Sequence, residues 1–191
     1  MNRPRLIPAV LAAASAVVLL AAGCGDEDLV RSGIWVVSIN ENKPLESDVA
    51  TAIIVADTLA GYSYKEDVVP IRFQMEGDVD ESLVPLGRWG HFIIHSYEVE
   101  YDLAGQGSVE GFSAGLGIAV EVGQIIDGHV LLVPADRKPQ PPLRDLLGSL
   151  NEIVATARVT FHAREVDSDG EVTFETAMPI AFADFGDEEE D

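Results

Sequence analysis

The segment Gly111-Phe112-Ser113-Ala114-Gly115 has the residue types of a nucleophilic serine held between glycines. In this G-x-S-x-G pattern the glycines permit a sharp turn, and the serine hydroxyl attacks an acyl group once a histidine and an aspartate activate it. Asp127, followed by His129 or His162, comes later in the chain in the required order. The pattern therefore raises acyl-transfer chemistry as a hypothesis.

The surroundings of Ser113 argue against that chemistry. A nucleophile of this type follows a buried apolar strand and precedes a helix. Residues 106–110, Gln-Gly-Ser-Val-Glu, are too polar for such a strand, and residues 116–122 have no helical pattern. We therefore expect that the protein is not an enzyme, and we keep a small exported serine hydrolase that uses Ser113 as the alternative.

Two acidic segments have the oxygen ligands that calcium prefers. Asp167-Ser168-Asp169-Gly170-Glu171 resembles the opening of a calcium-binding loop, but Ala177, Met178 and Pro179 stand where later ligands belong. Asp78-Val79-Asp80-Glu81 is a second acidic cluster. We interpret the first as the turn of a hairpin and the second as an exposed loop. We predict no metal and no cofactor, with calcium retained as the weaker alternative.

Histidines and aromatic residues offer two further candidate sites. His91 and His95 lie four apart in a strand-like segment, where the helical H-x-x-x-H zinc geometry is not available. Trp35, Trp89 and Tyr62 would form a platform for a sugar or a peptide if they were exposed together, although aromatic residues of β-sandwiches usually lie in the core.

The N-terminus has the three parts of an export signal. Arg3 and Arg5 precede an apolar run over residues 9–22, and the chain continues Leu20-Ala21-Ala22-Gly23-Cys24. The apolar run is shorter than the roughly 20 residues that span a bilayer. An export signal is therefore preferred to a transmembrane anchor.

The segment that ends at Cys24 resembles the lipobox of bacterial lipoproteins. That resemblance implies export, cleavage before Cys24, acylation of this cysteine and attachment to a membrane through the lipid. The alternative is an ordinary secretory signal that happens to end in a cysteine. Gly25 stands where enteric lipoproteins retained in the inner membrane have aspartate, which favours the outer membrane if the host is Gram-negative.

The charge of the chain excludes one class of partner. Loss of residues 1–23 removes two arginines and no acid, which takes the formal net charge from −21 to −23. Such a surface repels phosphate backbones, so we expect no nucleic-acid partner. Because Cys24 is the single cysteine, the domain has no intrachain disulfide and depends on its hydrophobic core.

The composition predicts four segments. Residues 1–23 are the signal peptide, 24–31 the lipidated N-terminus and tether, 32–186 one domain, and 187–191 a disordered acidic tail.

Within the domain the hydrophobic pattern predicts mainly strands. We expect strands at 34–39, 68–75 and 92–101, short strands joined by tight turns over 105–128, and a strand at 129–133. For residues 50–59 a strand is preferred to a helical turn. Pro70 indicates an edge position or a strand start. In 92–101 we place Ile93, His95, Tyr97, Val99 and Tyr101 on one face.

Two patterns in the last third are more distinctive. Leu143, Leu146, Leu147 and Leu150 recur at helical spacing after two prolines and predict one short helix near residues 141–150. Alternating apolar residues over 153–163 and 172–182, separated by turn residues, predict a long β-hairpin.

Together these elements predict an all-β fold, an antiparallel β-sandwich that resembles immunoglobulin-like and fibronectin type III-like domains. The antibody-type pair of cysteines around a tryptophan is absent. The hairpin also resembles one in uncharacterised bacterial lipoproteins of this size, for which no activity is implied. We predict a lipid-anchored, non-enzymatic structural or protein-interaction module with an envelope protein as partner.

Overall fold

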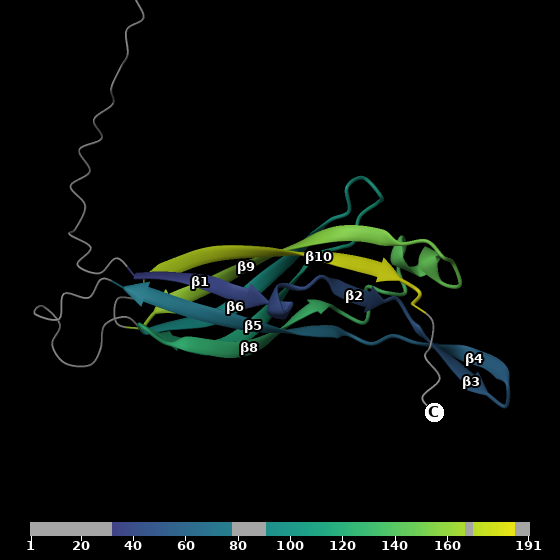
Figure 1. Cartoon of the computed structure of the whole chain (residues 1–191), viewed down its shortest axis with the longest axis horizontal. Coiled ribbons are helices and arrows are strands. Elements are labelled where there is room, and N and C mark those ends of the chain that lie inside the picture. The colour runs from purple at the N-terminus through teal and green to yellow at the C-terminus, as the bar shows by residue number, and fades with distance from the viewer. Residues whose placement is uncertain (1–31, 78–90, 167–169, 186–191) are drawn as a thin grey trace, which may run out of the picture.

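The computed structural model describes residues 32–77, 91–166 and 170–185, and these residues form an all-β structure (Figure 1). The predicted all-β class is confirmed. Cys24, the tether and the acidic tail lie outside the described residues. The elements are β1 (Ser32–Ile39), the 3-10 turn η1 (Asn40–Asn42), β2 (Leu45–Asp48), β3 (Thr51–Val55), β4 (Thr58–Ser63), β5 (Asp67–Gly77), β6 (His91–Asp102), β7 (Phe112–Glu121), β8 (Ile125–Val133), the 3-10 turn η2 (Leu143–Leu146), β9 (Ile153–Glu165) and β10 (Glu171–Ala183).

The strands form two larger sheets and one separate pair. The first sheet has the order β1-β5-β8, the second has the order β2-β10-β9-β6-β7, and β3 pairs only with β4 among the described strands. Neighbours are antiparallel except β2 and β10, which are parallel. Buried side chains from both larger sheets form one hydrophobic core, so the two sheets pack face to face (Figure 1).

The predicted C-terminal hairpin is confirmed as β9 and β10. The alternation of β9 places Ala155, Ala157, Val159, Phe161 and Ala163 in the core, and β10 contributes buried residues from its even positions. The rings of Phe161 and Phe73 meet edge to face with centroids 5.2 Å apart. This contact between β9 and β5 joins the two sheets at the centre of the core.

The long central strand is confirmed as β6, but its faces were predicted only in part. The register against β9 shifts between Ile94 and Ser96, and His95 has no partner residue on β9, so His95 is an extra residue in a β-bulge. A one-residue insertion reverses which alternate side chains face the core. Ile94 and Tyr97 are both buried as a result, whereas Ile93 and His95 are exposed. Their predicted place on the face of Tyr97 is wrong.

The glycine-rich segment 105–128 contains longer strands than predicted. β7 has ten residues and β8 begins at Ile125, and the two belong to different sheets. A Cβ atom at Gly128 would lie 2.5 Å from Cδ1 of Ile118 on β7. Gly128 thus permits close packing of β8 against β7 instead of ending a strand.

Pro70 does not mark an edge strand, because β5 is the middle strand of the three-stranded sheet. The sheet tolerates a proline, which has no backbone N–H, because β1 ends before it reaches Pro70. The pairing of β1 with β5 stops at Ile39 and Ile71, so Pro70 has a partner residue only in His129 on β8.

The prediction of a short helix near residues 141–150 is wrong, because the structure has only a 3-10 turn in this segment. Only Leu143–Leu146 form a helical element, a single 3-10 turn in which Leu143 and Leu146 are buried. Gly148 has a φ of +66° and ends the turn, and Leu150 is fully exposed. The i, i+3 spacing of the leucines suits a 3-10 turn as well as an α-helix.

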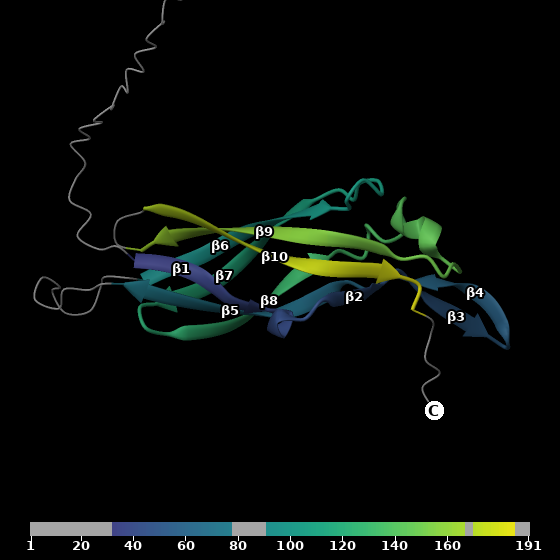
Figure 2. The same ribbon diagram turned by 45° about the horizontal axis from the view of Figure 1, so that its top comes forward.

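The predicted single strand over 50–59 is a hairpin in the structure. Ala56 and Asp57 have φ values of +49° and +60° and form the two-residue turn between β3 and β4. Positive φ at both positions is typical of a type I′ turn. The hairpin projects from one end of the two packed sheets (Figure 2).

Candidate interaction surfaces

The projecting hairpin carries large apolar side chains on its surface. We call residues Thr51–Ser63 the apolar hairpin. Its exposed residues include Ile53, Ile54, Val55, Leu59 and Tyr62, and both Ile54 and Val55 are 59% exposed. Asp57 is the one charged residue in this segment. An isolated two-stranded hairpin is only marginally stable in water, and a contiguous exposed apolar patch marks a surface that contacts something else.

A buried ion pair fastens both ends of the apolar hairpin to the domain. Lys138 is 1% exposed, and its Nζ lies 3.0 Å from Oδ2 of Asp67, just after the hairpin. The same Nζ donates to the backbone carbonyl of Asp48, just before the hairpin, at 2.7 Å. Ser47 Oγ donates to Asp67 at 2.6 Å. Because a buried ammonium is stable only with such partners, Lys138 fixes where the hairpin leaves the sheets.

The apolar hairpin lies at the opposite end of the sheets from the start of β1. Ser32 pairs with Gly77 at one end of β5, and the hairpin joins the other end of β5 near Asp67. Ten residues of strand at about 3.3 Å each separate these ends by about 33 Å. Figure 1 shows β1 beginning at the left and β3 and β4 projecting at the right.

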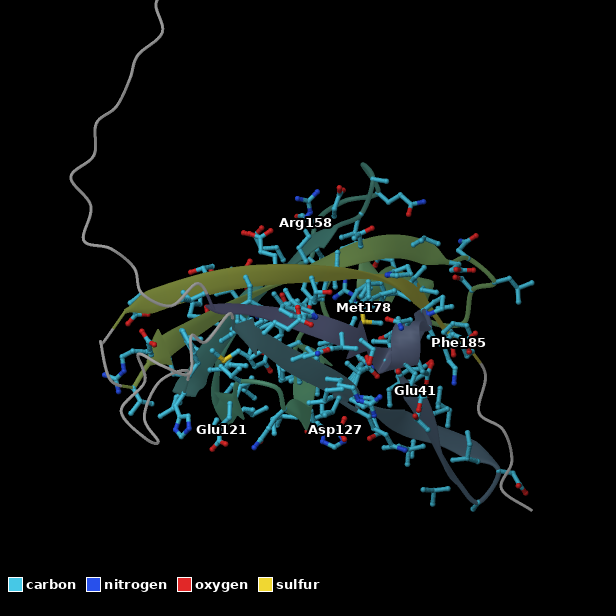
Figure 3. The ribbon with its side chains drawn as sticks, turned by 60° about the vertical axis from the view of Figure 1, so that its left-hand side comes forward. Glu41, Glu121, Asp127, Arg158, Met178 and Phe185 are labelled. Carbon is cyan, nitrogen blue, oxygen red and sulfur yellow. The ribbon has the colours of Figure 1, made fainter. Side chains whose placement is uncertain are left out.

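The structure does not assemble the predicted acyl-transfer residues. Ser113 lies within strand β7, exposed on the outer face of the five-stranded sheet, and not on a strand-to-helix turn. Asp127 and His129 lie on β8 of the other sheet and are also exposed, with the core between the two faces. His162 lies on β9. In Figure 3, Arg158 of β9 and Asp127 lie on opposite sides of the body.

Asp127 pairs with an arginine, whereas a catalytic triad would need it to pair with a histidine. Its Oδ1 lies 2.8 Å from Nε of Arg72. This hydrogen bond to the Asp127 carboxylate raises the pKa of the Arg72 guanidinium. The pair lies in a shallow groove of about 520 Å³ on the outer face of the three-stranded sheet, beside η1. Glu41 and Asn42 of η1 line this groove in left-handed backbone conformations.

The histidines of the five-stranded sheet each lie near a glutamate. His91 Nε2 is 3.6 Å from Glu121, and His95 Nε2 is 3.5 Å from Glu171. The imidazole rings of His95 and His162 stack with centroids 6.4 Å apart. His91 and His95 therefore do not converge on one site.

The metal candidates receive no support from the described residues. Residues 78–81 and 167–169 lie outside them, and Glu171, a described acid of the other segment, lies 3.5 Å from Nε2 of His95. In the part of the chain that the structure describes, no three histidine, cysteine, aspartate or glutamate side chains are grouped to hold a metal ion. Within the same residues, no helix is long and apolar enough to cross a membrane.

The aromatic candidates do not form a common platform. Trp35 is half-buried on β1, Tyr62 is exposed on β4, and Trp89 lies outside the described residues. Trp35 and Tyr62 belong to different sheets. Only Tyr62 contributes to the exposed apolar surface, as part of the apolar hairpin.

Sequence reasoning missed both the apolar hairpin and its anchor. A signal for the hairpin is present, since Ala56-Asp57 interrupts two short apolar runs with no polar alternation. Lys138 gives no local signal, because its partners are 71 and 90 residues away in sequence.

Comparisons with protein families and curated proteins give no match, so the role of the apolar hairpin is inferred from its own residues. No protein-family model matches the chain, and no curated protein matches it.

Proposed function

We propose that this protein is an exported lipoprotein, held in the cell envelope by acylated Cys24, that binds a protein partner through the apolar hairpin. The support for the anchor is the signal-like sequence of residues 1–24. The predicted membrane is the outer one if the host is Gram-negative. The role is non-enzymatic, a structural or protein-interaction module.

The observation that carries the proposal is the place of the apolar hairpin. An anchor at Cys24 leaves seven residues, 25–31, before β1, and these reach at most about 25 Å. The hairpin lies at the other end of the sheets, so it points away from the membrane that holds the lipid. A protein within the envelope is therefore its proposed occupant.

Charge indicates what kind of protein surface fits. Residues 45–67 contain five acidic residues and one lysine around the apolar side chains. A complementary site is an apolar recess with a basic rim. A second copy of this chain fits poorly, because two strongly acidic surfaces would repel each other.

We further propose an immunoglobulin-like arrangement for the sheets. In such domains strands A, B and E share one sheet, and G, F, C and C′ form the other. The orders β1-β5-β8 and β10-β9-β6-β7 follow this scheme, and the strands occur in the matching order along the chain. These domains commonly use strand edges and end loops for binding.

Affinity capture from envelopes of the native host tests the proposal. The double variant Ile54→Ser/Leu59→Ser removes two exposed side chains of the hairpin, and Ile125→Ser/Val154→Ser is its matched control, since Ile125 and Val154 are each 55% exposed elsewhere. We expect the hairpin variant to lose a partner that the wild type and the control retain. Equal recovery from all three proteins would refute the hairpin as the binding element.

The anchor has its own test. Mass spectrometry of the wild-type protein should show an N-terminus at Cys24 that carries acyl chains, and Cys24→Ser should leave the membrane fraction. A water-soluble wild-type protein with an unmodified cysteine would contradict lipidation and leave the hairpin test unaffected.

A further inference from the structure

Strand β7 is a long edge strand that lacks the proline and basic residues that commonly protect an edge, and its pairing with β6 has one register shift, opposite the segment Ile94–Ser96. Among the described strands it pairs only with β6, at the end of the five-stranded sheet. Its ten residues, Phe112–Glu121, include no proline, lysine or arginine, and Glu121 at the end is the only charge. Native edges are usually blocked by such residues, because a free row of backbone N–H and C=O groups invites another strand.

The side chains of β7 leave this edge open to an approaching backbone. Ser113, Gly115, Gly117 and Ala119 face outward and are exposed, and all four are small. Ser113 and Gly115 of the G-x-S-x-G pattern thus belong to this row of small residues. On the other face Phe112, Leu116 and Ile118 are only partly buried against the core, whereas Val120 is fully buried. An added strand would cover the three partly buried residues.

The start of β7 also offers a site for a basic side chain. A hollow of about 230 Å³ lies between Glu98 and Glu100 of β6 and the first residues of β7. Two strand spacings, about 9.6 Å, would separate an added strand from β6. A lysine or arginine reaching over Ser113 spans most of that distance.

The groups that face these two glutamates leave the hollow acidic. Glu98 Oε1 lies 3.8 Å from Nε2 of His162, and Arg158 is opposite Glu100 in the register of β9. The side chain of Glu98 is still 55% exposed. With the acidic chain around it, the hollow favours a positively charged occupant.

We propose that β7 accepts an extended, basic segment of a partner protein as an additional β-strand. Backbone hydrogen bonds to β7 supply the pairing, and lysine or arginine side chains at alternate positions meet Glu98 and Glu100. This surface is separate from the apolar hairpin and does not depend on it.

The test uses a fluorescent nine-residue peptide of alternating lysine and valine, with binding to the purified chain followed by anisotropy in 150 mM salt. Two further peptides are N-methylated at the odd or at the even positions. Because N–H groups of a strand point alternately to its two sides, we expect one methylated peptide to lose binding at least tenfold and the other to keep it. Equal binding of both, or no binding of the parent peptide, would overturn the proposal.

Variants of the chain provide the reciprocal test. A Cβ at Gly117 meets no atom within 4 Å and its φ is not left-handed, so Gly117→Lys and Gly117→Glu should both fold. We expect Gly117→Lys and Glu98→Gln/Glu100→Gln to weaken binding at least fivefold, and Gly117→Glu and the control Glu152→Gln/Glu175→Gln to retain it. A wild-type dimer that Gly117→Lys separates would instead assign the edge to a second copy and contradict the proposal.

Discussion

The hydroxyl of Tyr97 accepts a hydrogen bond from the backbone N–H of Leu131 at 2.9 Å and donates one to the carbonyl of the same residue at 3.2 Å. Tyr97 reaches from β6 of one sheet to β8 of the other. Tyr101 makes a similar bond to the carbonyl of Leu132. The edge strand β8 therefore has backbone groups satisfied by core tyrosines, whereas β7 has no such contact among the described residues.

Replacement of Tyr97 by phenylalanine should destabilise the fold. The variant keeps the ring but leaves both backbone groups of Leu131 without their partner, which costs about 1–3 kcal/mol. Urea denaturation would measure the loss in unfolding free energy. Tyr62→Phe, at an exposed tyrosine of the hairpin, is the control and should stay within about 0.5 kcal/mol of the wild type.

Stability should fall at alkaline pH because of the same tyrosines. Burial raises the pKa of Tyr97 and of Tyr101 above the ordinary tyrosine value of 10.0. The unfolded chain then loses these protons first, so the stabilisation is complete below about pH 10 and declines as the pH rises further. Unfolding free energies between pH 9 and 11 should decline less steeply for Tyr97→Phe/Tyr101→Phe; an unchanged slope would contradict this assignment.

Loss of Lys138 should loosen the apolar hairpin as well as the domain. Lys138→Met leaves the carboxylate of Asp67 without its ammonium partner, and breaking a buried ion pair in this way costs about 3–5 kcal/mol. Hydrogen exchange should accelerate in residues 51–63 relative to β9. The same substitution at exposed Lys65 is the control, and a hairpin that exchanges equally slowly in both variants would show that Lys138 does not fix it.

The hairpin turn should tolerate residues better suited to positive φ. Ala56 pays a steric cost in the left-handed region, where asparagine and glycine are favoured. Ala56→Asn/Asp57→Gly should slow hydrogen exchange in β3 and β4 by stabilising the hairpin by about 1 kcal/mol. A faster exchange would mean that the turn is not of the type I′ form described above.

The sequence predicted those parts of the fold in which local pattern and tertiary structure agree. The β9–β10 hairpin was predictable because its apolar residues alternate without interruption around a turn signal. The bulge at His95 was not, since one extra residue leaves no mark in composition. The turn at Ala56-Asp57 lacks the usual Asn-Gly, and the leucines of 143–150 fit a 3-10 turn and an α-helix alike.

The candidate surfaces were harder to predict than the strands, for a physical reason. Exposed apolar residues such as Ile54 look like core residues until the fold shows that no sheet covers them. Ser113 matched the pattern of a nucleophile because glycines flank it, whereas in the structure it lies on the outer face of the extended edge strand β7. The anchor at Cys24 remains a prediction from the sequence.

The central claim is that the apolar hairpin contacts an envelope protein, and site-specific photo-crosslinking in the native host tests it most directly. A photoreactive amino acid would replace Ile54 in one strain and Ile125, which has similar exposure on β8, in another. We expect the Ile54 position alone to yield an adduct with one protein of different sequence, and Leu59→Ser to abolish it. Adducts with lipid, with a second copy, or equally from both positions would contradict the claim.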